Sequence, residues 1–374
     1  MRKIFPCLLI VVAFGLLLLI KYPQIFKYEF NQNLVHDYLR SQDIEDPQGK
    51  IKDRIILSDS DLYIASGYLY ATGRNPVSYN FQHPPLIKYL FGFSTLLTGN
   101  PYFVQVLFGL ALLCLTYWLG AKLFKNPALS LIATGLLLID PVFGGMMNAA
   151  LLDLGQAVFA LGYVILMFFF PESFILQGLA LGLFAASKFW STVILFVALI
   201  FIYKILIRKE KINWEKTGTS FLIAFLVFCL TYTKSFIDSH GLFNIFLFLA
   251  KDLRFMLTHN STGSVGGPIL LFITGFFAPW WQKGVLRAGD WSFIWPAGLL
   301  ASLFLAIKTK LKKIESFFFL LPFTFLLLTS TQVPFTRYFI IILPFIYLSL
   351  ASLLLLTVLI ARNKKNSEER EREQ

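Results

Sequence analysis

Two carboxylates stand close together in the segment Ser58-Asp59-Ser60-Asp61. A carboxylate beside a substrate hydroxyl can take its proton and act as a general base. The same acids also fit a structural role, because Asp59 suits the N-cap of a helix expected over residues 62–71. Both interpretations stay open at this point, and each places the acids at the start of a short helix.

A histidine and a lysine flank a pair of prolines in the string His83-Pro84-Pro85-Leu86-Ile87-Lys88. Each proline fixes its own φ angle and removes a backbone N–H donor. The string therefore predicts a rigid bend that leads into a helix. We expect His83 and Lys88 to face an anionic phosphate across this bend; the alternative is a stiff loop that binds no ligand.

Further polar residues stand at or near the ends of apolar segments, and they are Asn148, Asp153, Lys188 and Arg337. Ionisable groups at membrane depth are costly and then mark a functional site, whereas Lys and Arg at the interface also serve as ordinary anchors. Asp153 suits either a helix N-cap or a group that orients a ligand. Arg337 suits bidentate binding of a phosphate. Because carboxylates, imidazole and cations gather on one face, we predict a reaction site there.

The elements that must position these residues are membrane helices. Of the 374 residues, 57% are hydrophobic and 14% are charged, whereas an average soluble domain is about 25% charged. This composition excludes a soluble globular enzyme and a disordered chain. Ten apolar runs approach the roughly 17–25 residues of a spanning helix, namely 4–20, 102–120, 128–147, 154–170, 174–190, 191–207, 218–233, 292–307, 316–330 and 337–360. We therefore predict an all-α polytopic membrane protein.

Two shorter apolar segments, 86–98 and 268–282, are predicted to be interfacial or re-entrant helices. The first should end at Gly99-Asn100-Pro101, and the second contains Trp280-Trp281, which suits the headgroup level. Pro141 predicts a kink in the apolar run that contains it. The three cysteines lie in apolar runs, so neither a disulfide nor a cysteine metal site is expected.

Basic residues indicate the orientation, since short cytoplasmic loops carry an excess of Lys and Arg. With the N-terminus in the cytoplasm, 18 of the 33 basic residues fall on the cytoplasmic side. The predicted organisation is one transmembrane domain over 1–360, with outer loops at 21–97 and 234–290 and a charged cytoplasmic tail at 361–374. Both termini are then cytoplasmic and the site lies outside. The net charge of +12 marks a membrane side, and no nucleic-acid partner is expected.

The second outer loop is predicted to carry an amphipathic helix over 243–256 that lies on the membrane. His240 and His259 in the same loop are interpreted as surface histidines. Membrane lipids are expected partners of the apolar helices.

Together the polar motifs resemble a known family. In chain order these motifs are the acids of the first outer loop, His83-Pro84-Pro85-Leu86 with Lys88, Leu151-Leu152-Asp153, Lys188-Phe189-Trp190, and Arg337-Tyr338. The order is similar to that in the protein O-mannosyltransferases and their relatives, which include bacterial aminoarabinose transferases. These are integral membrane glycosyltransferases of the GT-C class, and the resemblance covers roughly residues 1–200.

The resemblance implies a GT-C-like fold with about ten to eleven transmembrane helices. It implies a donor sugar carried on a polyprenyl phosphate, and inverting transfer at the non-cytoplasmic face with an acid of the first outer loop as base. In the family this acid stands four residues before a tyrosine, a spacing that Asp59 and Tyr63 match. Asp61 stays the alternative, because Ser60 occupies the place of the glutamate that often follows the family's acid.

Two departures from the family pattern shape the expected site. Asn148 stands where the family tends to have arginine, so neutralisation of the phosphate falls to Lys88, Lys188 or Arg337. The central outer loop lacks the large folded insert of the protein-mannosylating members, which favours a small or lipid acceptor over a protein, although lipid, glycan and protein acceptors all stay open. No cofactor is expected with certainty, and a requirement for a divalent cation stays open.

Two other function classes also fit the composition. One is a transporter or flippase of lipid-linked sugars, which would place polar groups near the bilayer midplane. The other is a non-catalytic subunit of a glycan-assembly complex. The gathering of polar groups at one end of the predicted helices favours the glycosyltransferase.

Overall fold

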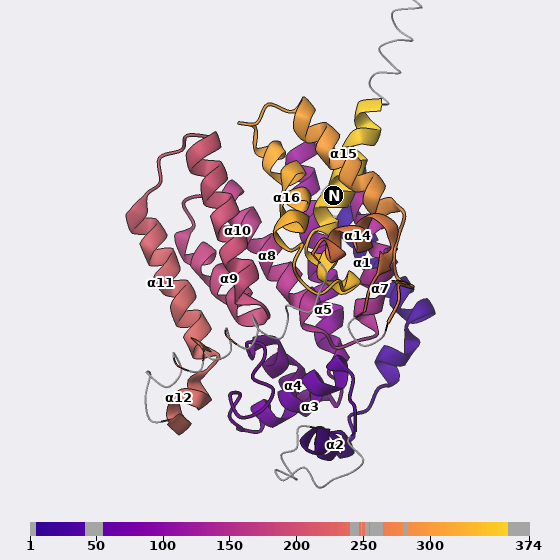
Figure 1. The fold of residues 1–374 in the computed structure, drawn as a ribbon, viewed down its shortest axis with the longest axis vertical. Helices are drawn as coiled ribbons and strands as arrows, with labels where there is room; N and C mark the ends of the chain where they lie inside the picture. The colour runs from indigo at the N-terminus through magenta and orange to yellow at the C-terminus, as the bar shows by residue number, and fades with distance from the viewer. Residues whose placement is uncertain are drawn as a thin grey trace, which may run out of the picture. The chain divides into compact units, whose positions relative to one another are not determined.

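The computed structural model describes residues 5–41, 55–239, 247, 249–250, 254, 265–279 and 283–357 (Figure 1). The chain divides into two compact units. Unit 1 comprises Met1–Val12, Leu113–Pro141 and Gly263–Gln374, and unit 2 comprises Ala13–Leu112 and Val142–Thr262.

Most of the described chain is helical, because a helix satisfies its own backbone hydrogen bonds where water is absent. The α-helices are α1 (Phe5–Lys21), α2 (Asn33–Ser41), α3 (Asp59–Ala71), α4 (Leu86–Thr98), α5 (Tyr102–Phe124), α6 (Pro127–Leu138), α7 (Pro141–Met147), α8 (Leu152–Phe169), α9 (Phe174–Ser187), α10 (Trp190–Ile202), α11 (Trp214–Leu230), α12 (Thr233–Ser239), α14 (Gly267–Thr274), α15 (Ile294–Lys308), α16 (Ile314–Leu328) and a last helix, Leu343–Thr357. Shorter turns are η1 (Pro23–Lys27), the π-helical η2 (Tyr203–Ile207) and η4 (Thr336–Ile341).

Each of the ten predicted apolar runs coincides with a helix or a helix pair in the described residues. By length and composition α5 and α8 suffice to cross a membrane, and α6 with α7 pass the same test together as a bent pair. Seven further apolar helices have 10–17 residues. The prediction of an all-α polytopic membrane protein is confirmed.

The predicted kink at Pro141 is a complete break. α6 ends at Leu138, α7 begins at Pro141, and the two axes differ by 62°. Proline removes a backbone donor and its ring clashes with the preceding turn. The run 128–147 is therefore two helices.

The prediction of one apolar helix over 268–282 is wrong. α14 ends at Thr274 because Gly275 adopts a left-handed conformation with φ of +78°. The chain then forms strand β1 (Phe276–Phe277), which pairs antiparallel with β2 (Leu286–Arg287). Trp280-Trp281, the predicted helix over 243–256 (of which only isolated positions are described), His240, His259 and the tail lie outside the described residues.

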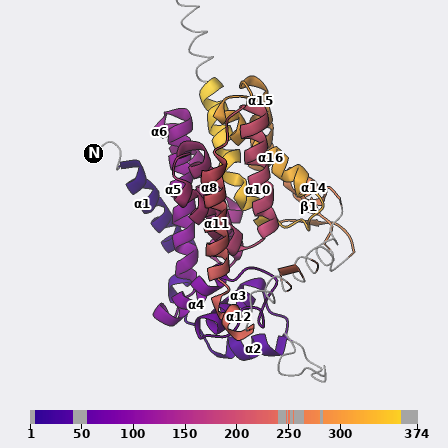
Figure 2. The ribbon, with the colours of Figure 1, turned by 90° about the vertical axis from the view of Figure 1, so that its left-hand side faces the viewer.

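In unit 2, α9 packs against α8 and α11, and α3 packs against α2 and α4. Figure 2 shows α2, α3, α4 and α12 together at one end of this unit. The contact between α3 and α4 is a backbone contact, because a Cβ atom on Gly67 would lie 2.2 Å from the Lys88 carbonyl oxygen. A Cβ on Gly92 would likewise lie 1.9 Å from the carbonyl oxygen of Gly67. Glycine at both positions therefore sets the distance between these two helices.

Candidate active site

The acidic turn begins α3, and its cap differs from the prediction. The helix starts at Asp59, three residues earlier than expected, and Ser58 is its N-cap. The Ser58 hydroxyl oxygen accepts from the Asp61 backbone N–H at 3.2 Å and donates to Asp61 Oδ2 at 2.7 Å. The interpretation of Asp59 as the cap is therefore wrong, and the cap hydroxyl bonds to Asp61. Both carboxylates are half-buried.

Burial near the acids raises the pKa of Tyr28. Tyr28, which follows η1, lies with its ring 5.0 Å from that of Tyr102. Burial, and then the neighbouring Tyr102 and Asp61, raise the pKa of Tyr28 to about 12. This phenol therefore stays protonated at physiological pH and can donate a hydrogen bond beside the acidic turn.

The bend before α4 is held by Lys88, whose side chain is fully buried. Its Nζ donates to the carbonyl oxygen of Asn80 at 2.6 Å, to Asn80 Oδ1 at 3.1 Å and to the carbonyl oxygen of His83 at 2.8 Å. The ammonium also lies 5.4 Å from the centre of the Tyr70 ring. An ammonium has three N–H donors, and three acceptors of the bend surround this one. Lys88 thus fixes the position of His83.

The His83 ring lies between two aromatic rings from different parts of unit 2. It meets Phe189 edge-on at 4.8 Å and Tyr63 at 6.0 Å between ring centres. Tyr63 belongs to the second turn of α3, and Phe189 separates α9 from α10. The bend with His83 is therefore in contact with both the acidic helix and the Lys188-Phe189-Trp190 segment.

A buried ion pair joins α8 to the end of α9. Lys188 Nζ lies 2.5 Å from Asp153 Oδ1, and the two side chains are 2% and 3% exposed. The other carboxylate oxygen, Asp153 Oδ2, is buried and has no hydrogen-bond partner in the structure. The prediction of Asp153 as an N-cap is wrong, because Leu151 occupies that position and Asp153 lies in the first turn. Its side chain pairs with Lys188, 35 residues away.

The irregular segment before α8 is held by side chains from three other elements. Gln24 Nε2 donates to Asn148 Oδ1 at 2.5 Å. Gln105 Nε2 donates to the carbonyl oxygens of Ala149 at 2.6 Å and Leu151 at 2.9 Å. The Ser60 hydroxyl oxygen accepts from the backbone N–H of Ala150 at 2.8 Å. These hydrogen bonds give partners to buried backbone groups that no helix satisfies.

Arg337 belongs to unit 1, at the start of η4. Its guanidinium carbon lies 4.7 Å from the centre of the Phe335 ring and 5.6 Å from that of Tyr338. The neighbouring Thr336 hydroxyl donates to Asp290 Oδ2 at 2.6 Å. The expected role of Arg337 in phosphate binding stays a prediction.

Unit 1 also contains a buried polar cluster that the sequence did not single out. Asp140 Oδ2 accepts from Trp295 Nε1 at 2.8 Å and from the hydroxyl of Tyr347. An acid directly before a helix-breaking proline is a weak signal for such a cluster. Neither Trp295 nor Tyr347 carries a signal, because both lie within apolar runs.

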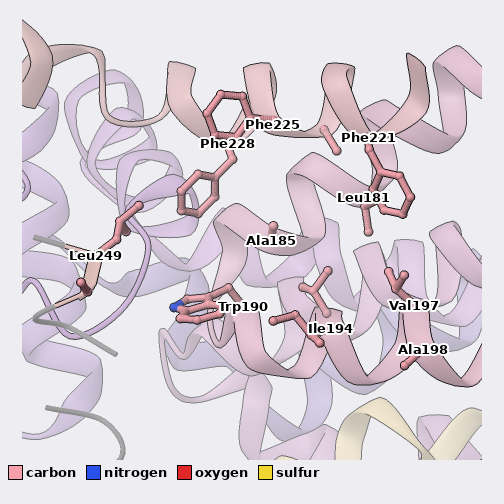
Figure 3. Close-up of a pocket in the computed structure, with 13 residues that line it drawn as sticks. Leu181, Ala185, Trp190, Ile194, Val197, Ala198, Phe221, Phe225, Phe228 and Leu249 are labelled. Atoms are coloured by element: carbon pink, nitrogen blue, oxygen red, sulfur yellow. The ribbon is translucent and has the colours of Figure 1, made fainter. Parts of the chain in front are cut away.

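An apolar cavity of about 570 Å³ lies among α9, α10 and α11. Figure 3 shows aromatic side chains of α11 on one side and Trp190 with Ile194 of α10 on the other. The residues that line it are Leu181, Ala185, Trp190, Val193, Ile194, Val197, Ala198, Phe221, Ala224, Phe225, Phe228, Leu249 and Ala250. Trp190 stands two residues after Lys188, so the cavity adjoins the segment that carries the buried cation.

The structure therefore connects most of the predicted site residues within unit 2. Lys88 holds the bend of His83, whose ring contacts Phe189, and Phe189 follows the lysine that pairs with Asp153. Ser60, between the two acids, bonds to the segment that leads from Asn148 into α8. Among the described residues, no three His, Cys, Asp or Glu side chains gather as they would around a metal ion. The three cysteines are free thiols.

Two crystal structures have a similar fold. ArnT from Cupriavidus metallidurans in the apo state aligns over 79% of this chain and 55% of its own, with a TM-score of 0.57 and 16% identity. ArnT from the same organism bound to undecaprenyl phosphate aligns over 85% of this chain and 58% of its own, with a TM-score of 0.60 and 15% identity. The chain has the fold of ArnT.

The expectation of a GT-C-like fold is thereby confirmed. No protein-family model matches the sequence, and no curated protein matches it. The chain spans little more than half the length of the ArnT structures that it resembles.

Proposed function

We propose that the protein is a glycosyltransferase that moves a sugar from a polyprenyl phosphate to the hydroxyl of an acceptor at the non-cytoplasmic membrane face. The observation that carries the proposal is the continuity of the Lys188-Phe189-Trp190 segment with the apolar cavity. A buried cation stands at one end of this segment, and Trp190 at its other end lines the cavity. A polyprenyl phosphate has the matching parts, a charged head and a long apolar tail. The fold supports the same donor class, because one similar structure is bound to undecaprenyl phosphate.

In the proposed reaction the acceptor oxygen attacks the anomeric carbon of the donor sugar in line with the leaving phosphate. The new carbon–oxygen bond forms as the bond to the phosphate oxygen breaks, so the configuration inverts. The acceptor proton passes to a carboxylate of the acidic turn. Polyprenyl phosphate departs with the negative charge that develops on its oxygen, where a fixed cation is most effective.

Asp59 is the proposed base. It is the acid that stands four residues before Tyr63, and Asp61 stays the alternative.

Lys188 is the proposed cation for the phosphate, with Asp153 as the group that orients it. Asp153 already pairs with this ammonium inside unit 2. Lys88 has a different part in the proposal, because its donors are directed to Asn80 and to the carbonyl oxygen of His83. The roles of His83, Asn148 and Arg337 stay as predicted from the sequence.

The test of the proposal compares Asp59→Asn with Asp61→Asn in the full chain, reconstituted in lipid and supplied with lipid-linked sugars extracted from its source membranes. A general base contributes about 10²–10⁴-fold, so Asp59→Asn should lose transfer by that factor without loss of folding. Asp61→Asn serves as the matched control and should keep most of the activity. A dead Asp61→Asn beside an active Asp59→Asn reassigns the base, and full activity of both overturns the mechanism.

A further inference from the structure

We propose that Ser60 is a positioning residue that aligns the acidic turn of α3 with the ion pair of α8 and α9. The inference rests on the proposed function, since it concerns the geometry of that same site. Ser60 stands between the two candidate bases, and its side chain is directed away from solvent at 9% relative exposure. Its hydroxyl oxygen accepts the Ala150 backbone N–H at 2.8 Å, across 90 residues of sequence.

The segment that Ser60 binds is the irregular link between α7 and α8. Ala150 is fully buried, so its N–H has no access to water. The carbonyl oxygens on either side of it, from Ala149 and Leu151, accept from Gln105. Ser60 of α3 thus binds the N–H donor of this segment, and Gln105 of α5 binds its two carbonyl acceptors.

This contact transmits position to the reacting groups. Asp153 stands three residues after Ala150, in the first turn of α8. Its Oδ1 atom lies 2.5 Å from Lys188 Nζ. Asp59 is the direct neighbour of Ser60. The Ser60–Ala150 bond therefore links the acidic turn directly to the segment that leads into α8. Misplacing a reacting group by about 1 Å can cost about 100-fold in rate.

The chain offers a matched control in the same helix. Ser66 is also a buried serine of α3, but its hydroxyl donates to the Leu62 carbonyl oxygen within that helix at 2.6 Å. Removing it deletes a hydroxyl of the same kind without touching the link to the 149–151 segment.

The experiment measures kcat and KM for Ser60→Ala, Ser60→Thr and Ser66→Ala in the reconstituted full chain, with the lipid-linked sugar extract as donor. Ser60→Ala should lower kcat about 10- to 100-fold while KM for the donor changes less than twofold. Ser60→Thr keeps the hydroxyl and should restore most of kcat. Amide hydrogen exchange should accelerate at Ala150 in Ser60→Ala and stay unchanged there in Ser66→Ala.

The outcomes separate this inference from the proposed function. An active wild-type protein with an unchanged Ser60→Ala variant overturns the positioning role alone. If Ser60→Ala does not fold, Ser60→Cys, whose sulfur is a weaker acceptor, should give an intermediate kcat, and wild-type kcat in that variant overturns the inference. Absence of transfer by the wild-type protein contradicts the proposed function and, with it, the role of Ser60.

Discussion

The Lys188–Asp153 pair shows how a single buried interaction joins folding to the site. Removing two charges from water has a large desolvation penalty. Their mutual attraction offsets this penalty only when the geometry is good. Here the nitrogen and oxygen lie 2.5 Å apart with almost no exposure, while Asp153 Oδ2 stays without a hydrogen bond. A purely structural role would be served as well by two apolar side chains. The charged pair is consistent with the proposed role of Lys188 at the phosphate.

A double-mutant cycle tests this argument at the residue scale. Lys188→Met or Asp153→Leu alone should lower the free energy of unfolding by about 3–5 kcal/mol, because each leaves an uncompensated buried charge. The double variant should recover most of that stability, measured by thermal unfolding in detergent, yet should not bind undecaprenyl phosphate. Binding at wild-type affinity by the double variant would contradict the role of Lys188.

The control for this cycle is an exposed ion pair of the same unit. Lys216 pairs with Glu172, and their side chains are 39% and 81% exposed. Exposed pairs contribute about 0–1 kcal/mol, so Lys216→Met should leave both stability and lipid binding unchanged.

At the scale of elements, the position of the acidic turn depends on how closely α3 approaches α4. The backbones touch at Gly67 and Gly92, where any Cβ atom would collide with a carbonyl oxygen. Small residues at a helix contact permit such an approach in membrane proteins. The sequence contains both glycines, but nothing in their local context says that they face one another.

Substitution of either glycine should separate the two helices. Gly67→Ala is expected to destabilise the protein by about 1–3 kcal/mol, as overpacking does, and to lower transfer because Lys88 and His83 move relative to α3. Gly162→Ala in α8 is the matched control, since no atom lies within 4 Å of the added Cβ. Equal melting temperatures for the two variants would refute the close contact.

The cavity among α9, α10 and α11 gives a second prediction at this scale. Ala185→Phe adds an aromatic ring to the lining and should weaken binding of undecaprenyl phosphate at least tenfold, because the tail loses its space. Ala128→Phe on the exposed side of α6 should leave binding unchanged, as measured by titration in detergent. An unchanged affinity of Ala185→Phe for undecaprenyl phosphate would show that the tail does not bind in this cavity.

For the whole molecule, the orientation in the membrane decides on which face the proposed transfer takes place. The excess of Lys and Arg in short connectors predicts cytoplasmic termini. Reporter fusions or cysteine labelling should therefore place Lys122 and Lys313 in the cytoplasm and a cysteine introduced at Gly73 outside. Labelling of position 73 from the cytoplasmic side only would invert the topology and, with it, the face on which transfer is proposed.

The identity of the transferred sugar can be tested by removing the whole protein from cells. Mass spectrometry of lipid-linked sugars in cells that lack the protein should reveal one accumulated polyprenyl-phosphate species, because its consumer is missing. An unchanged lipid profile would instead favour a non-catalytic subunit. The chain aligns with little more than half of each ArnT structure of similar fold, so the sugar that it transfers is decided by this experiment.

The sequence by itself determined the class of protein and the approximate course of its helices. Apolar runs and the prolines and glycines that end them act locally, so 86–98 and the break at Pro141 were predictable from a few neighbouring residues. Local rules failed at Asp59 and Asp153, where a cap was one of two interpretations, and at 268–282, where one glycine in a left-handed conformation ends the helix.

Only the tertiary structure decided which polar groups meet. Asp153 pairs with a lysine 35 residues away, and Ser60 bonds to a backbone amide 90 residues away. Lys88 donates to the bend that carries His83, and its expected role at a phosphate stays a prediction. Buried charges and hydrogen-bonding groups must find partners wherever packing brings them, and packing depends on contacts between distant helices that no local pattern encodes.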